Sequence, residues 1–458
     1  MLFYNAHSAI ISYINFFCAL SFVLLPCEIY HREFDAKLNI ATQLASIFSY
    51  PCLIGYDKHF NRLSRVLSSS VLLEKSVSSI MWAARIEPTK SRGGSVVVCD
   101  EEGFNNLAFS STSSALNRVD PHASSVIDTY CCWGDIDFTF FQNVPQLSSK
   151  LNIVGNSRSD LLSSTGHQLY LERISGLKAL FGDFILCTDN FCIENKSGPY
   201  SPPTFNVSKE EALKAQEEFR ARFQEQIQLR KFFAESIFEA AVAFPTRQFV
   251  IRPHPCADPR WWTNYFWSLD NVHVICLHSI DPWLHAASMM ISIGCTSALQ
   301  SVITKTPVIE LSHPEIQVLE HNRGYAHHFT PYFASSGFEL IKCINAILSN
   351  QHSDFINLAK LSKYWHNCFS TNISLDYANI LASYCNTSTN SFNLSMDVVS
   401  GYSQTYAKNP LSINLAKWTK PSFSSVKDRV FRLLNIHNLE RNVSVHKVAD
   451  CLYAILPS

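Results

Sequence analysis

The sequence predicts an α/β protein built from two doubly wound domains and a C-terminal extension. Short apolar runs alternate with helical stretches through residues 21–165, and a second series of the same kind runs through 166–385. Strands that alternate with helices form mostly parallel sheets with helices on both faces. The chain has 458 residues, roughly three times the length of a single domain. A hydrophobic content of 47% is ample for two large cores.

The first series begins with the run SFVLLPCEI, which we expect to be the first strand. The segment that follows, DAKLNIATQLASIF, has apolar residues at helical spacing. The alternation then continues in chain order with PCLIGY, a short helix from His59, SVLLEK, SVVVCDEEG and LNIVGNSRSD. Residues 21–165 are therefore predicted to form the N-terminal domain.

The second series opens with the strand FILCTD and the loop GPYSPP. Ser208 then begins a long helix, because Glu211 completes a capping box with it. The next strands are QFVIRPHP, VHVICL, MMISI and PVIEL, and the last helices are FELIKCINAIL, DFINLAKLSKYW and LDYANILASYC. We expect 166–385 to be the C-terminal domain. Residues 386–458 begin rich in Ser and Asn, which predicts a linker and a tail with one or two docking helices.

Composition excludes several classes of protein. The net charge is -1, with 37 Lys and Arg against 38 Asp and Glu, whereas a general nucleic-acid binder would be basic. No nucleic-acid partner is therefore expected. The fifteen cysteines are scattered without a CxxC pair, which favours buried free thiols in a reducing compartment over zinc or disulfides.

The first 27 residues contain no Asp, Glu, Lys or Arg. A membrane span would have this composition, whereas a secretory signal would carry basic residues. Because a helical stretch follows at once, we interpret the second half as the first strand and residues 1–20 as an apolar extension. Insertion of 1–20 in a membrane stays open, and so does peripheral contact at the inner membrane for an otherwise cytoplasmic protein.

Ligands of doubly wound sheets lie beyond the carboxyl ends of the strands, so the residues that follow strands are informative. In the second domain, Arg252 and His254 follow an apolar strand, and the prolines at 253 and 255 restrict the backbone around the imidazole. Such a pair can donate hydrogen bonds to a phosphate. A capping or core histidine in a Pro turn explains the motif equally well.

A second strand of the same domain ends before Gly294, and Thr296 and Ser297 then open a helix. A helix N-terminus that carries hydroxyl groups is suited to bind an anion, although simple N-capping is the alternative. The next strand brings Glu310 to the same edge. Together with His254, these residues predict a phosphate or diphosphate pocket.

Acidic residues follow two strands of the first domain. Arg32 and Asp35 lie after the first strand, and Glu101 and Glu102 follow SVVVCD. Three acids in a row (100–102) are unlikely to serve packing, although some can cap the next helix. A carboxylate that faces the phosphate site of the other domain could act as a general base.

Eight segments occur in the order HREFDAKL, LLEKS, CDEEG, VGNSRSDLL, IRPHP, NVHVI, SIDPWLHAA and GCTSALQSVITKTPVIEL. Together they resemble the bacterial surface carbohydrate biosynthesis proteins, a GT-B-type group. More distantly, they are similar to the CDP-glycerol glycerophosphotransferases and to the capsule transferases that use CMP-activated sugars. The resemblance covers residues 22–313. It implies two Rossmann-like domains that face each other across a cleft, with a helical C-terminal extension.

In those relatives an HP motif and an S/T motif hold the phosphate of the donor nucleotide. The matching residues are His254 with its following proline and Thr296 with Ser297. Gln300 stands where many GT-B enzymes carry a ribose-binding Glu, and position 157 is Ser where the relatives usually show Pro. Arg158 and Asp160 match the pattern and are expected in the cleft with Arg32.

The implied function is transfer of a sugar or polyol-phosphate from a CMP- or CDP-activated donor to a glycan or lipid-linked acceptor. The donor is a substrate, and no cofactor or metal is expected. Arg252, His254, Gly294, Thr296, Ser297, Gln300 and Glu310 would bind the donor, and Glu101, Glu102 or Asp35 would deprotonate the acceptor. A nucleotide-sugar epimerase and a catalytically inactive scaffold protein of the same fold are the alternatives.

Overall fold

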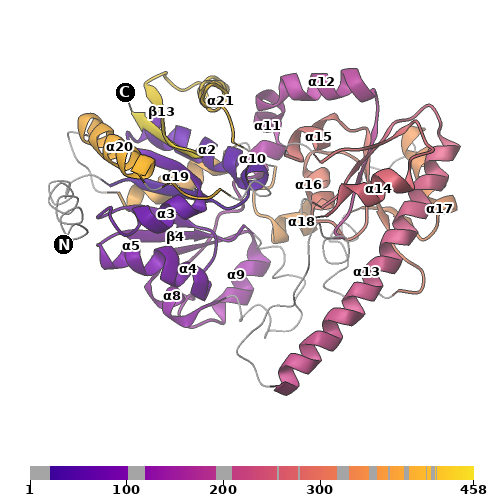
Figure 1. Ribbon diagram of the computed structural model, residues 1–458, viewed down its shortest axis with the longest axis horizontal. Coiled ribbons are helices and arrows are strands. Elements are labelled where there is room, and N and C mark those ends of the chain that lie inside the picture. Colours follow the sequence, from indigo (N-terminus) through magenta and orange to yellow (C-terminus); the bar gives the residue numbers. More distant parts are fainter. Residues whose placement is uncertain are drawn as a thin grey trace. The chain divides into compact units, whose positions relative to one another are not determined.

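The computed structural model describes residues 21–101, 119–191, 209–254, 257–276, 279–316, 330–349, 358–369, 372–385, 391–408, 410–413, 418 and 420–457. The chain divides into two compact units. Unit 1 comprises Met1–Leu169 and Leu361–Ser458, and unit 2 comprises Tyr170–Lys360. Unit 2 is therefore inserted between the two parts of unit 1, as the colours of Figure 1 show.

Unit 1 contains an eight-stranded sheet with the order β13-β14-β2-β1-β3-β4-β5-β6. Its strands are β1 (Val23–Cys27), β2 (Cys52–Tyr56), β3 (Val71–Glu74), β4 (Ser95–Cys99), β5 (Thr129–Cys132), β6 (Leu151–Ile153), β13 (Val443–Ala449) and β14 (Leu452–Pro457). The first six strands pair in parallel, and β14 joins β2 in the antiparallel direction.

Helices cover both faces of this sheet. One face packs against α3 (Asp57–Leu63), the π-helix η1 (Trp82–Ile86), α8 (Pro121–Val126), α9 (Asp135–Gln142) and α20 (Ser391–Lys408). The other face packs against α2 (Tyr30–Ile47), on which α19 (Ile373–Ser383) and α21 (Phe423–Ile436) lie. Shorter helices complete the unit: α4 (Ser79–Met81), α5 (Glu87–Ser91), α10 (Ser159–Leu162) and α11 (Ser164–Leu169).

Unit 2 contains a six-stranded parallel sheet with the order β12-β11-β10-β7-β8-β9. Its strands are β7 (Ile185–Thr188), β8 (Phe249–Arg252), β9 (Val272–Val274), β10 (Met289–Ser292), β11 (Val308–Leu311) and β12 (Tyr332–Ala334). Buried apolar side chains fill the strands, as expected for a parallel sheet covered on both faces.

The helices of unit 2 also lie on both faces of the sheet. α13 (Lys209–Ala243), α14 (Pro259–Tyr265) and α17 (Gly337–Leu348) enclose one core. α12 (Leu171–Phe181), α15 (Asp281–Ala286) and α16 (Ser297–Ile303) lie on the opposite face. α18 (Leu358–Tyr364) crosses from unit 2 into the second part of unit 1. Each unit is thus doubly wound, which confirms the predicted fold class.

The C-terminal part differs from its prediction. The Ser- and Asn-rich segment expected to be a linker contains the 18-residue helix α20. The expected docking helices are one helix, α21, followed by the hairpin β13–β14. Residues 361–385, which the sequence assigned to the second domain, belong to unit 1.

The hairpin β13–β14 is fixed by a close approach to β2. Cys451 forms the turn with a positive φ of 60°, and its carbonyl accepts the amide of Tyr56. A Cβ atom on Gly55 would lie 2.1 Å from this carbonyl oxygen. A glycine is therefore required here, and every residue of β14 is buried.

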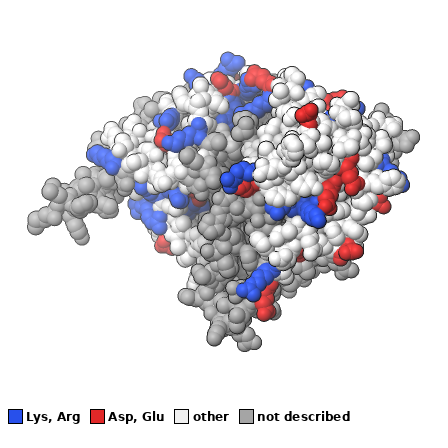
Figure 2. Space-filling model, turned by 45° about the vertical axis from the view of Figure 1, so that its right-hand side comes forward, with Lys and Arg blue, Asp and Glu red and all other residues white. Residues whose placement is uncertain are grey.

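All described cysteines are free thiols, and most are buried, in agreement with the sequence. Acidic and basic side chains are interspersed on the face that Figure 2 shows. Among the described helices, none is long and apolar enough to cross a membrane.

Candidate functional site

The carboxyl ends of the unit 2 strands carry a row of polar side chains. The strand registers align Glu310 with Ser292, Ser292 with Thr188, and Thr188 with Arg252. These residues alternate with the apolar core residues of their strands, so they point to the face that α15 and α16 cover. Thr188 and Ser292 were not among the site residues predicted from the sequence, although a polar residue at the end of an apolar strand can be recognised there.

The order of the strands places a topological switch point within this row. The chain runs from β7 to β8 on one side, and β10 lies on the other side of β7. Ligands of doubly wound sheets bind at such a topological switch point. Residues that follow β7, β8 and β10 are therefore the candidate ligand contacts of unit 2.

Asp189, directly after β7, is a site residue that the sequence analysis did not identify. Its Oδ1 accepts the backbone N–H of His254 at 3.2 Å and that of Phe191 at 3.0 Å. The residue is 2% exposed, and Oδ2 has no hydrogen-bond partner among the described residues. Burial raises the pKa of Asp189 to about 6. Asp189 thus fixes the turn of His254 and keeps one acceptor oxygen for another group.

Glu310 holds the neighbouring turn. Gly294 has a φ of +63°, and its N–H donates to Oε1 of Glu310 at 2.8 Å. Glu310 is buried, and burial raises its pKa to about 7. Its structural role is therefore to orient the chain between β10 and α16.

Thr296 and Ser297 lie at the start of α16, as the sequence predicted. Thr296 is exposed and makes no capping hydrogen bond with its side chain. The Oγ of Ser297 lies 2.9 Å from the Sγ of Cys295. Because the Thr296 hydroxyl does not cap the helix, the alternative of simple N-capping does not explain it. Gln300 lies one turn further on and is buried.

Arg252 packs against an aromatic ring of α15. Its guanidinium lies 4.9 Å from the ring centroid of Trp283, a distance typical of a cation–π contact. Burial lowers the pKa of Arg252 to about 10, so the side chain stays charged at neutral pH.

The turn of His254 and the turn of residues 294–297 lie at the same edge of one sheet. They follow β8 and β10, which are separated by β7, so their backbones are about 10 Å apart at the usual strand spacing. Asp189, on the strand between them, contacts the first turn directly. The sequence-predicted donor residues of unit 2 are thus brought to one edge.

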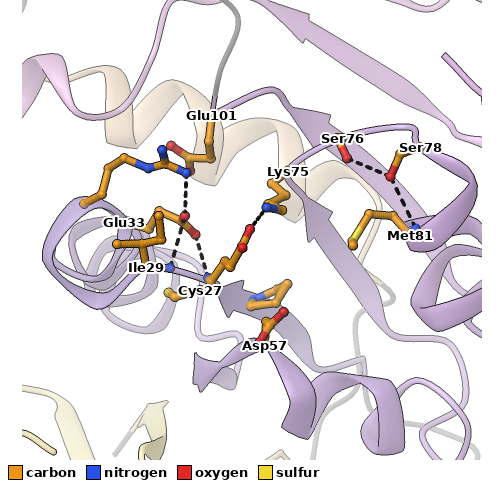
Figure 3. Close-up of polar contacts among 12 residues, drawn as sticks. Cys27, Ile29, Glu33, Asp57, Lys75, Ser76, Ser78, Met81 and Glu101 are labelled. Atoms are coloured by element: carbon orange, nitrogen blue, oxygen red, sulfur yellow. Dashed lines mark hydrogen bonds and ion pairs between the residues drawn. The ribbon is translucent and has the colours of Figure 1, made fainter. Parts of the chain in front are cut away.

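The corresponding edge of unit 1 has its switch point between β1 and β3, because β2 and β3 lie on opposite sides of β1. Glu33 and Lys37, on α2, and Glu101, after β4, form a buried cluster here. Figure 3 shows Glu33 and Glu101. Lys37 Nζ lies 3.3 Å from Glu33 Oε2 and 3.3 Å from Glu101 Oε1, and it donates to the carbonyl of Pro26 at 2.7 Å.

The opposite charges of Glu33, Lys37 and Glu101 favour the charged form of each neighbour. Burial alone would raise the pKa of Glu33, but Lys37 and Arg32 outweigh it, and the pKa is lowered. Burial likewise opposes the charge of Lys37, yet Glu33 and Glu101 raise its pKa. Oε2 of Glu101 is buried and has no hydrogen-bond partner within the described ranges. Glu101 is thus a fixed carboxylate with one acceptor oxygen to spare.

The other predicted residues of unit 1 have structural contacts. Asp35 pairs with Arg429 of α21, and Arg32 pairs with Glu33 at 3.2 Å. Asp35 therefore holds a C-terminal helix rather than joining Glu101. Glu102 lies outside the described residues.

Asp160 and Arg158 lie at the start of α10. The two carboxylate oxygens of Asp160 accept the backbone N–H groups of Ile373 at 2.9 Å and Ser374 at 2.8 Å. Asp160 therefore anchors the N-terminus of α19, and burial raises its pKa to about 6. Arg158 is buried at the preceding position.

Within the described part of the chain, no three His, Cys, Asp or Glu side chains gather as they would around a metal ion.

Two doubly wound units, each with polar residues at the carboxyl edge of its sheet, are features of the GT-B fold class. The sequence matches no protein-family model and no curated protein. Among solved structures, a variant of the wall teichoic acid polymerase TagF aligns with a TM-score of 0.52 at 8% identity, covering 83% of this chain and 90% of that chain. A TagF variant soaked with CDPG gives 0.50 at 10% identity, covering 82% and 89%.

The UDP-GlcNAc 2-epimerase of Methanocaldococcus jannaschii, in complex with UDP-GlcNAc and UDP, covers 80% of this chain and 99% of that chain at 15% identity, with a TM-score of 0.48. The TagF alignments show the fold of this chain. The distant resemblance that the sequence motifs indicated is therefore confirmed at the level of the GT-B fold.

Proposed function

We propose that the protein is a GT-B glycosyltransferase-like enzyme of surface polysaccharide biosynthesis. It transfers a sugar or polyol-phosphate from a CMP- or CDP-activated donor to a glycan acceptor. The observation that carries the proposal is the convergence of His254 and the turn of residues 294–297 on the switch-point edge of unit 2, around Asp189.

In this proposal unit 2 binds the donor. Arg252 and His254 provide cationic or N–H donors to the leaving phosphate, and the Thr296 and Ser297 hydroxyls add further donors. Preorganised donors stabilise the negative charge that develops on a leaving group, and removing one typically costs about 3 kcal/mol of barrier. Asp189 and Glu310 keep the two turns in place through hydrogen bonds to backbone N–H groups.

Unit 1 supplies the acceptor-side carboxylate. Glu101 is the residue we assign to deprotonate the acceptor hydroxyl, because one oxygen is fixed by Lys37 and the other is unpaired within the described ranges. A general base needs such a fixed position within hydrogen-bond reach of the proton that it removes.

The proposal is tested at His254. We expect CMP and CDP to raise the melting temperature of the protein more than UDP does. His254→Ala should abolish this stabilisation and donor turnover while the far-UV circular dichroism spectrum stays unchanged. His273→Ala, on β9 of the same sheet, is the matched control and should keep both. Unchanged donor binding in His254→Ala would remove the assignment of the pocket.

An inactive scaffold protein is the second candidate. Gln300 in place of the ribose-binding Glu of related enzymes, and Ser157, favour it. Nucleotide binding without transfer, across a broad panel of acceptors, would support this alternative. A nucleotide-sugar epimerase would instead respond to UDP-sugars and turn them over without an acceptor.

A further inference from the structure

Two charged residues meet at the switch point of the unit 1 sheet. Glu28 follows β1 directly and Lys75 follows β3 directly, and the two strands are neighbours in the sheet. Their side chains form an ion pair and stay 23% and 17% exposed. Figure 3 shows Lys75 near the strand ends, in the same close-up as Glu33 and Glu101. This pair has no part in the catalytic assignment above.

The ion pair of Glu28 and Lys75 is connected to Glu101 through two buried side chains, Glu33 and Lys37. Glu33 accepts the backbone N–H of Glu28 at 2.8 Å and that of Ile29 at 3.3 Å. Lys37 in turn links Glu33 to Glu101. The turn that carries Glu28 and the carboxylate of Glu101 are therefore held by the same two buried side chains, so their positions are coupled.

The ion pairs around this edge of unit 1 indicate the class of ligand. Four cations here each have a carboxylate partner: Lys75 with Glu28, Lys37 with Glu33 and Glu101, Arg32 with Glu33, and Arg85 with Glu74 and Asp57. An anionic ligand would have to compete with these carboxylates for the cations. Hydroxyl groups can instead donate to a carboxylate and accept from an ammonium group without separating the pairs.

The unpaired oxygen of Glu101 gives an independent indication of a ligand. Glu101 is 7% exposed, and its Oε2 finds no hydrogen-bond donor within the described ranges. A buried carboxylate oxygen without a donor is costly. A ligand O–H group would satisfy it, whereas a phosphate dianion would bring a second negative charge to it.

We propose that Glu28, Lys75 and Glu101 form a subsite for an uncharged sugar or polyol. The carboxylates accept from its hydroxyl groups and the ammonium donates to one of them. This inference rests on the proposed function, because it names the acceptor of that reaction as a neutral hydroxyl-bearing unit rather than a phosphate ester.

Saturation-transfer NMR on the full chain tests the subsite. The probes are two matched pairs: glycerol with glycerol 3-phosphate, and methyl glucoside with glucose 6-phosphate. We expect the neutral member of at least one pair to bind more tightly than its phosphate ester. Glu28→Gln and Lys75→Met should each weaken that binding at least tenfold, and Lys58→Met, on the exposed surface after β2, should leave it unchanged.

CMP binding, measured on the same samples, separates this inference from the proposed function. Because CMP is assigned to unit 2 and both variants lie in unit 1, an unchanged far-UV circular dichroism spectrum and urea midpoint report that each variant is folded. Loss of sugar binding in both variants with unchanged CMP binding supports the subsite. The inference is overturned if the wild type binds neither neutral probe, if Lys75→Met binds as the wild type does, or if the phosphate esters bind more tightly. Sugar binding that depends on Lys75 without any binding of CMP would leave the subsite in place and refute the donor site.

Discussion

Glu310→Gln isolates the energetic effect of a buried carboxylate at the candidate donor site. In the folded chain Glu310 is buried, and its pKa is raised by that burial from 4.5 to about 7. A glutamine side chain has nearly the same shape and can still accept the Gly294 N–H through Oε1. The variant therefore removes the ionisation and keeps the contact.

The magnitude follows from the raised pKa. A folded-state pKa above the unfolded one means that the folded protein binds the proton more tightly, so stability is lost as the pH rises from 4.5 through 7. One pKa unit is equivalent to about 1.4 kcal/mol. Between pH 5 and pH 8 the wild type should lose about 2 to 3 kcal/mol through this group alone.

The assay is urea unfolding at pH 5, 6, 7 and 8, with unit 2 followed by hydrogen exchange of peptides from β10 and β11. The stability of Glu310→Gln minus that of the wild type should grow with pH by about 2 to 3 kcal/mol. Any constant cost of the amide group cancels in this comparison. Glu315→Gln, at an exposed position of the same segment, is the control and should show no such trend. A difference that stays flat from pH 5 to pH 8, or shrinks, would refute the reasoning.

Three further substitutions test contacts of unit 1. Asp160→Ala leaves the N–H groups of Ile373 and Ser374 without their acceptor, so urea unfolding should show a loss of about 3 kcal/mol; a loss below 1 kcal/mol would contradict the anchoring of α19. Lys37→Met leaves Glu101 buried without its cation and leaves Glu33 with Arg32 alone, so it should destabilise by about 3 to 5 kcal/mol, whereas Lys58→Met should change the stability little. Trp418→Phe removes the Nε1 donor to the carbonyls of Cys27 and Glu28 and should speed hydrogen exchange in β1 about tenfold, an effect absent in Trp267→Phe.

Most of the strands that the sequence predicted correctly share a simple property, although β6 and β9, which it also predicted, are only partly buried. Each of β1, β2, β7, β8, β10 and β11 is a short apolar run bounded by polar or turn residues, and each is buried on both faces. Local pattern is enough for such strands. The positions of His254 and the 294–297 turn after their strands followed from the same pattern.

What the sequence did not predict depends on contacts between distant residues. β14 pairs with β2, about 400 positions earlier in the chain, and α19 is anchored by Asp160, 213 positions away. No local period encodes such pairings. The roles of Asp35 and Asp189 were missed for the same reason, because each is defined by a partner that only the folded chain brings near.

The discontinuity of unit 1 has a consequence for synthesis on the ribosome. Tyr170–Lys360 is one continuous stretch, and it can fold as soon as it leaves the exit tunnel, as domains generally do. The earlier 169 residues must wait until the hairpin at 443–457 emerges, because that hairpin covers the otherwise open side of β2. Nascent chains halted shortly after residue 360 would therefore expose an unpaired apolar strand, and we expect them to depend on chaperones more than the completed protein does.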